Sequence, residues 1–221
     1  MTPSVAEAVV VFARTPELGR VKTRLAAAYG DDAALRLHRA FLADSLAAAR
    51  ATGASVVLAH TPGESFAEQL LADHAIVQRG EGFAARFDAA LSDAHALLGD
   101  ETRYVVIGVD TPHLGPLALR AALNALKRAS TALGAGRREG FYLLGFRGSP
   151  VPVASAIGRP DEARAVAALL ESAGRPPAAL PLWDDIDLPE DVERLARHLR
   201  IATGWRPERT LSALDGLGLL H

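Results

Sequence analysis

The segment AEAVVVFARTPELGRVKTRL, residues 6–25, joins a valine-rich apolar run to a loop that carries a proline, a glycine and four cations. β-Branched residues favour strands, and a run that is apolar at every position is typical of a strand buried on both faces of a parallel sheet. Pro16 and Gly19 predict that the strand ends before them. The segment therefore predicts a buried strand with a basic loop at its carboxyl end. The four cations are Arg14, Arg20, Lys22 and Arg24.

The rest of the chain alternates short apolar runs with longer segments of helical periodicity, which is typical of parallel βαβ units. We expect one α/β/α sandwich of the Rossmann-like class with a mostly parallel central sheet. The strands are expected at 9–14, 55–60, 75–78, 104–109, 130–135, 141–146 and 178–183. The helices are expected at about 32–52, 64–73, 83–98, 116–129, 161–173 and 189–202.

One departure from a regular parallel sheet is expected. The runs at 130–135 and 141–146 are too close for a helix between them, so an antiparallel pair should interrupt the parallel order.

We expect one domain over residues 1–203. Residues 204–221, rich in Gly, Pro and Leu, should form an appendage that packs on the core or on a second copy of the chain in a homodimer.

Composition excludes several classes of protein. The 221 residues include 24 Lys and Arg against 26 Asp and Glu, so no global field would hold nucleic acid or an anionic membrane. Cysteine is absent, which excludes disulfides and thiolate metal sites. No apolar run approaches the ~20 residues that a membrane span needs. We expect a soluble cytoplasmic protein in which any cationic function is local.

The basic loop is the first candidate site. Ligands of open α/β sheets bind at the carboxyl ends of the strands, and the helix that should start near Thr23 adds free backbone N–H groups there. We expect this corner to bind phosphate, although its spacing is not that of a Walker A loop. The alternative is a solvated loop in which Lys22 and Arg24 pair with Glu17 or Asp31.

The second candidate is VVIGVDTPHLGP, residues 105–116, where an apolar strand leads to Asp110 and the chain then turns at Pro112. A carboxylate at this edge is a natural ligand for Mg²⁺ or Mn²⁺, which bridges to phosphate oxygens. Alternatively, Asp110 caps the following turn through its own backbone. His113 could assist as an acid, a base or a partner of the carboxylate, or have no role.

The third candidate is LWDDIDLPEDVERL, residues 182–195, another strand that ends in carboxylates. Asp185 and Asp187 are two residues apart in an extended segment, so they point to the same side and could share one cation. For Asp187 a capping-box role together with Glu190 is an equal alternative. Capping does not account for Asp184 or Asp185.

Together these motifs resemble the bacterial glycosyltransferase A family related to arsenosugar-biosynthesis glycosyltransferases. That family belongs to the nucleotide-diphospho-sugar transferase superfamily, with MobA-like and CofC-like nucleotidylyltransferases. The resemblance covers the chain to about residue 200. Its most specific part is the pattern P-x-x-G-x-V-K-T-R-L, which is matched here from Pro16 to Leu25.

The resemblance implies a GT-A-like fold and roles for individual residues. The basic loop would cradle the diphosphate of a nucleotide-linked substrate, and Asp110 would be the metal-binding residue of a G-x-D-x-P motif. Asp185 and Asp187 would add metal contacts, and the implied cofactor is Mg²⁺ or Mn²⁺. The residues implied in nucleotide and phosphate binding are Phe12, Ala13, Arg14, Lys22, Arg24, Gln78, Gly80 and Arg86.

The chain also departs from the family pattern. Where the family has Q-x-G-x-D-L-G-E-R-M, this chain has Gly82 in place of the aspartate, and where the family has G-P-x-x-D-G-G-Y-Y-L, Arg138 replaces the aspartate. The later W-S-T element is missing. A cation cannot serve as the ligand or base that an acid provides. With Asp110 in the catalytic centre, Glu139 and His113 are the candidate bases on the acceptor side.

Three functions are compatible with these features. The first is a metal-assisted transfer of sugar from a nucleoside-diphosphate sugar to a small-molecule acceptor. The second is nucleotidyl transfer from a nucleoside triphosphate with release of pyrophosphate. The third is a nucleotide-binding or scaffold protein on the same fold with a decayed active site, since a fold alone does not specify a function.

Overall fold

A seven-stranded sheet forms the centre of the computed structural model, which describes residues 6–138 and 140–221. The strand order is β3-β2-β1-β4-β6-β5-β7, and β6 runs antiparallel to both of its neighbours while the other pairs are parallel. The mostly parallel sheet and its antiparallel interruption are thus confirmed. The strands are β1 (Glu7–Ala13), β2 (Ser55–His60), β3 (His74–Val77), β4 (Arg103–Ile107), β5 (Thr131–Ala135), β6 (Phe141–Arg147) and β7 (Pro177–Ala179).

The helices follow the expected order with two differences. The segment expected as a helix at 64–73 forms only a short 3₁₀ helix, η1, because Asp73 is already tied to β2 by backbone and side-chain bonds to Val56. A helix at Glu208–Asp215 was not expected from the sequence. The helices are α1 (Thr23–Tyr29), α2 (Asp31–Arg50), η1 (Ala67–Leu71), α3 (Gly82–Leu98), α4 (Pro116–Ala125), α5 (Glu162–Ser172), α6 (Pro189–Ile201) and α7 (Glu208–Asp215).

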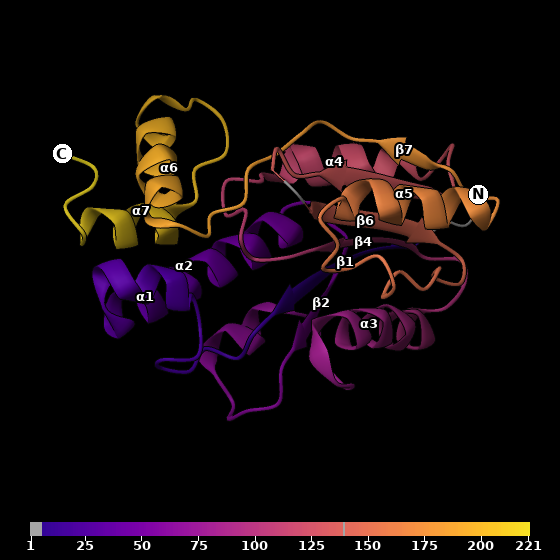
Figure 1. Cartoon of the computed structure of the whole chain (residues 1–221), viewed down its shortest axis with the longest axis horizontal. Coiled ribbons are helices and arrows are strands. Elements are labelled where there is room, and N and C mark those ends of the chain that lie inside the picture. The colour runs from indigo at the N-terminus through magenta and orange to yellow at the C-terminus, as the bar shows by residue number, and fades with distance from the viewer. Residues whose placement is uncertain (1–5, 139) are drawn as a thin grey trace.

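Helices cover both faces of the sheet, as the continuous apolar strands require (Figure 1). Successive residues of β1 point to opposite faces, so Val9 and Val11 pack with α2 and α4 while Val10 and Phe12 pack with α3 and α5. All four side chains are buried. The layered α/β/α architecture is therefore that predicted from the sequence.

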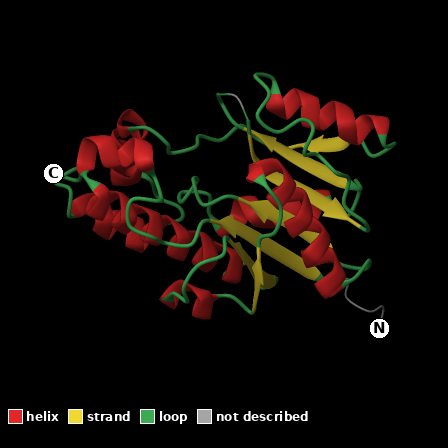
Figure 2. Ribbon diagram, turned by 60° about the horizontal axis from the view of Figure 1, so that its bottom comes forward, coloured by secondary structure: helices red, strands yellow, loops and turns green. Residues whose placement is uncertain are grey.

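A further hydrophobic cluster lies beyond the end of the sheet. It joins α1, α6 and α7 to the first half of α2, and these helices form the group on the left of Figures 1 and 2. Leu37 and Phe41 of α2 are fully buried within it, and Ile186 packs there just before α6. The cluster thereby fixes the segment that carries Asp185 and Asp187 relative to the basic loop.

The C-terminal tail packs on the rest of the chain. Leu214 of α7 is fully buried in this cluster, and the carboxylate of Asp44 accepts hydrogen bonds from the backbone N–H groups of Arg209 and Thr210. The division of the chain at residue 203 stays a prediction. In the described part of the chain, no helix combines the length and the apolar character needed to cross a membrane.

Candidate functional site

A cavity of about 410 Å³ opens at the carboxyl edge of β1 and β4. The end of β1, the loop before α1, the start of α3, the loop after β4, the start of β6 and the segment at 185–187 all contribute to its lining. β6 contributes because it is antiparallel, which places its first residues at the edge where the parallel strands end. The cavity therefore lies where open α/β sheets bind ligands.

Most of the site residues predicted from the sequence line this single cavity. It brings together positions that are up to 175 residues apart in the chain, from Phe12 to Asp187. The predicted residues in its lining are Phe12, Ala13, Arg14, Lys22, Arg24, Gln78, Arg86, Asp110, Asp185 and Asp187.

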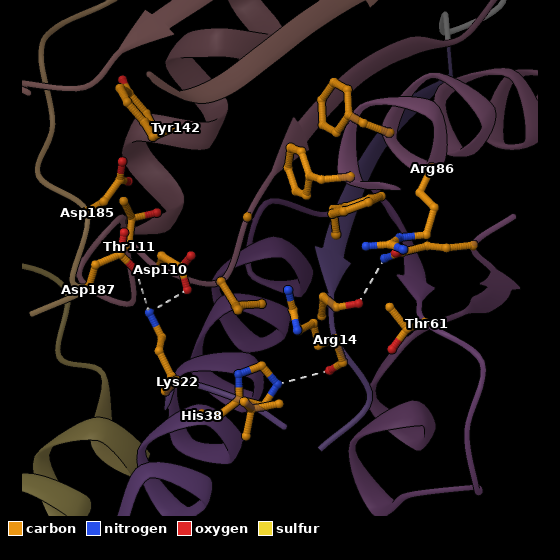
Figure 3. A pocket seen from close by; sticks show the side chains of 18 of the residues that line it. Arg14, Lys22, His38, Thr61, Arg86, Asp110, Thr111, Tyr142, Asp185 and Asp187 are labelled. Carbon is orange, nitrogen blue, oxygen red and sulfur yellow. Dashed lines mark hydrogen bonds and ion pairs between the residues drawn. The ribbon is translucent and has the colours of Figure 1, made fainter. Parts of the chain in front are cut away.

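One wall of the cavity is built from carboxylates around Lys22 (Figure 3). The Lys22 ammonium lies 2.7 Å from Asp110 Oδ1 and 3.2 Å from Asp187 Oδ1. It also donates to the carbonyl oxygen of Ile186 at 2.5 Å. Only 6% of the Lys22 side chain is exposed. Lys22 therefore does not pair with Glu17, which instead binds Arg20.

The backbone of Lys22 is unusual. Its φ of 47° makes it the sole non-glycine residue with a positive φ in residues 6–138 and 140–221. Such a conformation is strained for an L-residue with a long side chain and is often found at functional sites. Helix α1, which starts at Thr23, has only seven residues, so the side chains of the loop contribute more to this corner than the helix dipole does.

The electrostatics of this wall favour an additional positive charge. Burial alone would lower the pKa of Lys22, but Asp110 and Asp187 raise it above its usual value. The pKa of Asp185 is raised to about 7 by burial and by the neighbouring charges of Asp110 and Asp187. Two carboxylates thus pair with one cationic side chain, and a third carboxyl group lies beside them.

Asp110 and Asp187 would supply only part of the coordination shell of a divalent ion. Among the residues described, no three His, Asp or Glu side chains are grouped so as to hold a metal ion by themselves. Mg²⁺, however, is commonly held by one or two carboxylates together with water and phosphate oxygens. Asp110 and Asp187, each with about two fifths of the side chain exposed, provide hard oxygen donors of this kind.

The opposite wall is basic, and Figure 3 shows Arg14 and Arg86 on the side away from the carboxylates. Arg14 donates to the carbonyl oxygen of Arg20, and its own carbonyl accepts a hydrogen bond from His38 Nε2. Arg86 lines the same cavity, and its Nε is buried without a hydrogen-bond partner. This wall therefore has cationic donors available for an anionic ligand.

Gln78 lines the cavity, and its amide is held in one orientation. Its Nε2 donates to the carbonyl oxygens of Ala13 and Ala59, at 2.8 Å and 2.9 Å, which fixes the orientation of the amide. In this orientation Oε1 is the amide atom left without a donor, and it is buried with no hydrogen-bond partner in the protein. A buried polar atom without a partner is costly, so a ligand N–H group is a natural partner for it.

An aromatic surface adjoins Arg86, and of its four rings only Phe12 was predicted from the sequence as a site residue. Phe12, Phe83, Phe87 and Phe141 line the cavity, and their neighbouring ring centroids lie 5.4 to 6.0 Å apart. Half of Phe83 is exposed. The i, i+4 spacing of Phe83 and Phe87 at the start of a helix could have indicated that they share a face.

Asp191 positions the carboxylate segment and caps α6. Its buried carboxylate accepts hydrogen bonds from the backbone N–H groups of Asp187 and Leu188 and forms ion pairs with Arg138 and Arg194. These contacts lower the pKa of Asp191 to about 2 although burial opposes the shift. The capping role considered for Asp187 is therefore wrong, because Asp191 performs it and the side chain of Asp187 faces Lys22.

Two predicted residues lie outside the cavity lining, and a third is not among the described residues. Gly80, with a φ of 110°, forms the turn before α3 and is not part of the lining. His113 lies outside the lining and packs instead against the rings of Trp183 and His198. Glu139 falls outside the described residues. Arg138, at a position where the family has an acid, serves Asp191 as described above.

The half-buried His113 should make stability depend on pH. Its pKa is lowered to about 4 by burial and by the nearby His198 and Arg194. Between pH 6.5 and 4 the unfolded chain thus binds a proton at this residue that the folded protein does not, so lowering the pH through this range destabilises the fold. The loss should reach at most about 3 kcal/mol, and it should be absent in His113→Gln.

Urea unfolding at pH 7 and pH 4 measures this difference. The free energy of unfolding of the wild type should fall by more than that of His113→Gln over the interval. The exposed His74 offers a matched control, since His74→Gln should retain the wild-type dependence. If the free energy of unfolding falls equally with pH in the wild type and in His113→Gln, then His113 is solvated in the folded protein.

Comparisons with known proteins agree with this fold. The model of a family described as "Uncharacterized protein conserved in bacteria (DUF2064)" matches residues 42–157. Among curated proteins, none matches the chain. A solved structure from Desulfovibrio desulfuricans G20, described as a "putative nucleotide-diphospho-sugar transferase", is 28% identical, with a TM-score of 0.84 over 97% of this chain and 96% of that one.

More distant solved structures share the fold. One is a 4-diphosphocytidyl-2C-methyl-D-erythritol synthase, 14% identical, with a TM-score of 0.57 over 86% of this chain and 96% of that one. Another is Rv0371C of Mycobacterium tuberculosis H37Rv in complex with manganese, 19% identical, with a TM-score of 0.51 over 87% and 98%. These two matches show the fold alone, whereas the match at 28% identity confirms the predicted resemblance to the nucleotide-diphospho-sugar transferase superfamily.

Proposed function

We propose that this chain, which belongs to the DUF2064 family, is a metal-assisted transferase. It would bind a nucleoside-diphosphate sugar in the cavity at the carboxyl edge of the sheet and pass the sugar to a small-molecule acceptor. The observation that carries this proposal is one cavity with two opposed walls. Carboxylates and Lys22 form one wall, and the arginines with the aromatic surface form the other. A diphosphate would pair with the arginine wall, and a divalent cation bound to it would pair with the carboxylate wall.

The basic and aromatic wall would hold the nucleotide. Arg14, Arg24 and Arg86 supply cationic donors for the phosphates, which arginine binds well through paired N–H groups. The exposed ring of Phe83 offers a stacking surface for a base, and the orphaned Oε1 of Gln78 would accept an N–H of that base. The solved nucleotide-diphospho-sugar transferase at 28% identity supports the same class of ligand.

The carboxylate wall would hold the cation. Asp110 and Asp187, with Asp185 beside them, are the protein ligands in this proposal, and the manganese complex of the distant Rv0371C structure is consistent with it. When bound, Mg²⁺ or Mn²⁺ would stabilise the negative charge that develops on the leaving diphosphate. The arginines stabilise the same charge from the opposite side, and this preorganised electrostatic effect is the main catalytic contribution expected of the protein.

Nucleotidyl transfer is the second candidate, because a solved synthase that makes a diphosphocytidyl product shares the fold. The two reactions differ in their products. Incubation with Mn²⁺ and UDP, GDP or dTDP sugars should release free nucleoside diphosphate as the sugar passes to water, which takes the place of the acceptor in this assay. Incubation with a nucleoside triphosphate and a sugar phosphate should release no pyrophosphate. Pyrophosphate formation would overturn glycosyl transfer in favour of the second candidate, and binding without either product would indicate a binding protein.

A further inference from the structure

Lys22 is fully engaged by the protein, which conflicts with a simple role as a phosphate ligand. An ammonium group has three donors, and here they face Asp110 Oδ1, Asp187 Oδ1 and the carbonyl oxygen of Ile186. With 6% of the side chain exposed, no donor is left for a substrate. Lys22 must therefore change partners before it can bind a phosphate.

The partners of Lys22 are the same oxygens that a divalent cation would use. A cation coordinated by Asp110 and Asp187 would lie about 2 Å from their oxygens, within a few ångströms of the ammonium. Two positive centres so close in a buried place repel strongly. The negative charge of Asp110 and Asp187 can therefore neutralise either the Lys22 ammonium or the cation, but not both at once.

The main chain and side chain of Lys22 favour such an exchange. Its left-handed backbone, at φ 47° and ψ 42°, is costly for a residue with a long side chain, and such strain is common at sites that change partners. The flexible four-carbon stem of lysine lets the ammonium move without a change of fold. The cavity that Lys22 lines continues toward Arg14 and Arg24, where the phosphates are placed in the proposed function.

We propose that Lys22 is a resident counter-ion, which a divalent cation displaces from Asp110 and Asp187 and thereby releases toward the diphosphate. The identity of the released lysine's partner rests on the proposed function, whereas the displacement itself needs only the cation. Because the cation makes a phosphate-binding group available, it and the nucleotide should each strengthen the binding of the other, as thermodynamic linkage requires.

The chain provides an internal control for this exchange, since Lys22 and Lys127 are its only lysines. Lys127 is exposed on the outer surface of the fold just after α4. Labelling with an amine-reactive acylating reagent, read by peptide mass spectrometry, should modify Lys127 fast and Lys22 slowly. Addition of Mg²⁺ or Mn²⁺ alone should raise the rate at Lys22 about tenfold or more, with no change at Lys127. If the metal leaves the ratio of the labelling rates at Lys22 and Lys127 unchanged, the proposal is overturned.

A second measurement tests the competition directly. Removal of the resident counter-ion in Lys22→Met should tighten Mn²⁺ binding about tenfold or more in the absence of nucleotide, as followed by the electron paramagnetic resonance of free Mn²⁺. Lys127→Met should bind Mn²⁺ as the wild type does. Equal or weaker Mn²⁺ binding by a folded Lys22→Met would contradict the exchange. The labelling experiment uses the wild type, so it decides the question even if Lys22→Met does not fold.

Failure of the exchange and failure of the proposed function can be told apart. Neither measurement contains a nucleotide. A cation-dependent increase in Lys22 labelling supports the exchange even if no nucleotide binds in a separate titration. Tight nucleotide binding with no increase in labelling keeps the proposed function and overturns the exchange.

Discussion

Replacement of Asp110 by asparagine should lower the rate of transfer by about a thousandfold while the protein stays folded. The substitution removes a negative charge from the wall where the cation is proposed to bind, and losses of this order follow removal of one group that stabilises the transition state. The backbone of Asp110 keeps its hydrogen bond from Ile186 N, at 2.8 Å, so the segment that carries Asp185 and Asp187 should stay in place. Steady-state rates with and without Mn²⁺ measure the effect.

The exposed ion pair between Asp93 and Arg79 provides the matched control. Asp93→Asn makes the same chemical change outside the cavity, so it should leave the rate within about twofold of the wild type, as expected for a surface pair. Asp110→Asn with a wild-type rate and a wild-type dependence on Mn²⁺ would remove Asp110 from the proposed mechanism.

Replacement of Asp191 by alanine should lower the free energy of unfolding by about 2 to 4 kcal/mol. The carboxylate of Asp191 is completely buried and satisfies two backbone N–H groups as well as Arg138 and Arg194. Its loss leaves the two N–H groups at the start of α6 without a partner, each at a cost of about 1 to 3 kcal/mol. Urea unfolding at pH 7 measures the change.

Asp161 allows a direct comparison, because it also forms ion pairs with two arginines, Arg159 and Arg164, but 31% of its side chain is exposed. Asp161→Ala should destabilise the protein much less. The acid dependence gives a second test. Because the pKa of Asp191 is depressed to about 2, its contribution is complete above pH 4 and is lost as the pH falls toward 2. Asp191→Ala with wild-type stability would show that the segment at 185–187 is held mainly by its apolar contacts.

The layout of the sheet could be predicted from the sequence because it depends on local signals. Apolar runs such as residues 9–12 and 56–59 must be buried on both faces, and such strands require helices on each side. The common edge of the parallel strands then places Asp110 and the basic loop together. The short gap between β5 and β6 was enough to indicate the antiparallel pair.

The rest of the site depends on contacts that no local pattern encodes. Lys22 and Asp187 are 165 residues apart, and their pairing requires the cluster that packs Ile186 against Leu25 and Phe41. Motif spacing suggested a cap at Asp187, but the N-cap residue is Leu188, and Asp191 three residues later accepts the hydrogen bond from its backbone. His113 was a plausible base from its place in a loop, yet it lies outside the cavity lining and packs against the ring of Trp183.

We propose that one cavity binds a nucleoside diphosphate between a carboxylate wall and an arginine wall. Isothermal titration calorimetry with UDP, GDP, dTDP and their sugars, with and without Mn²⁺, measures this binding. At least one of these nucleotides should bind, and Mn²⁺ should strengthen its binding. If no nucleotide binds under either condition, the cavity is not a nucleotide site.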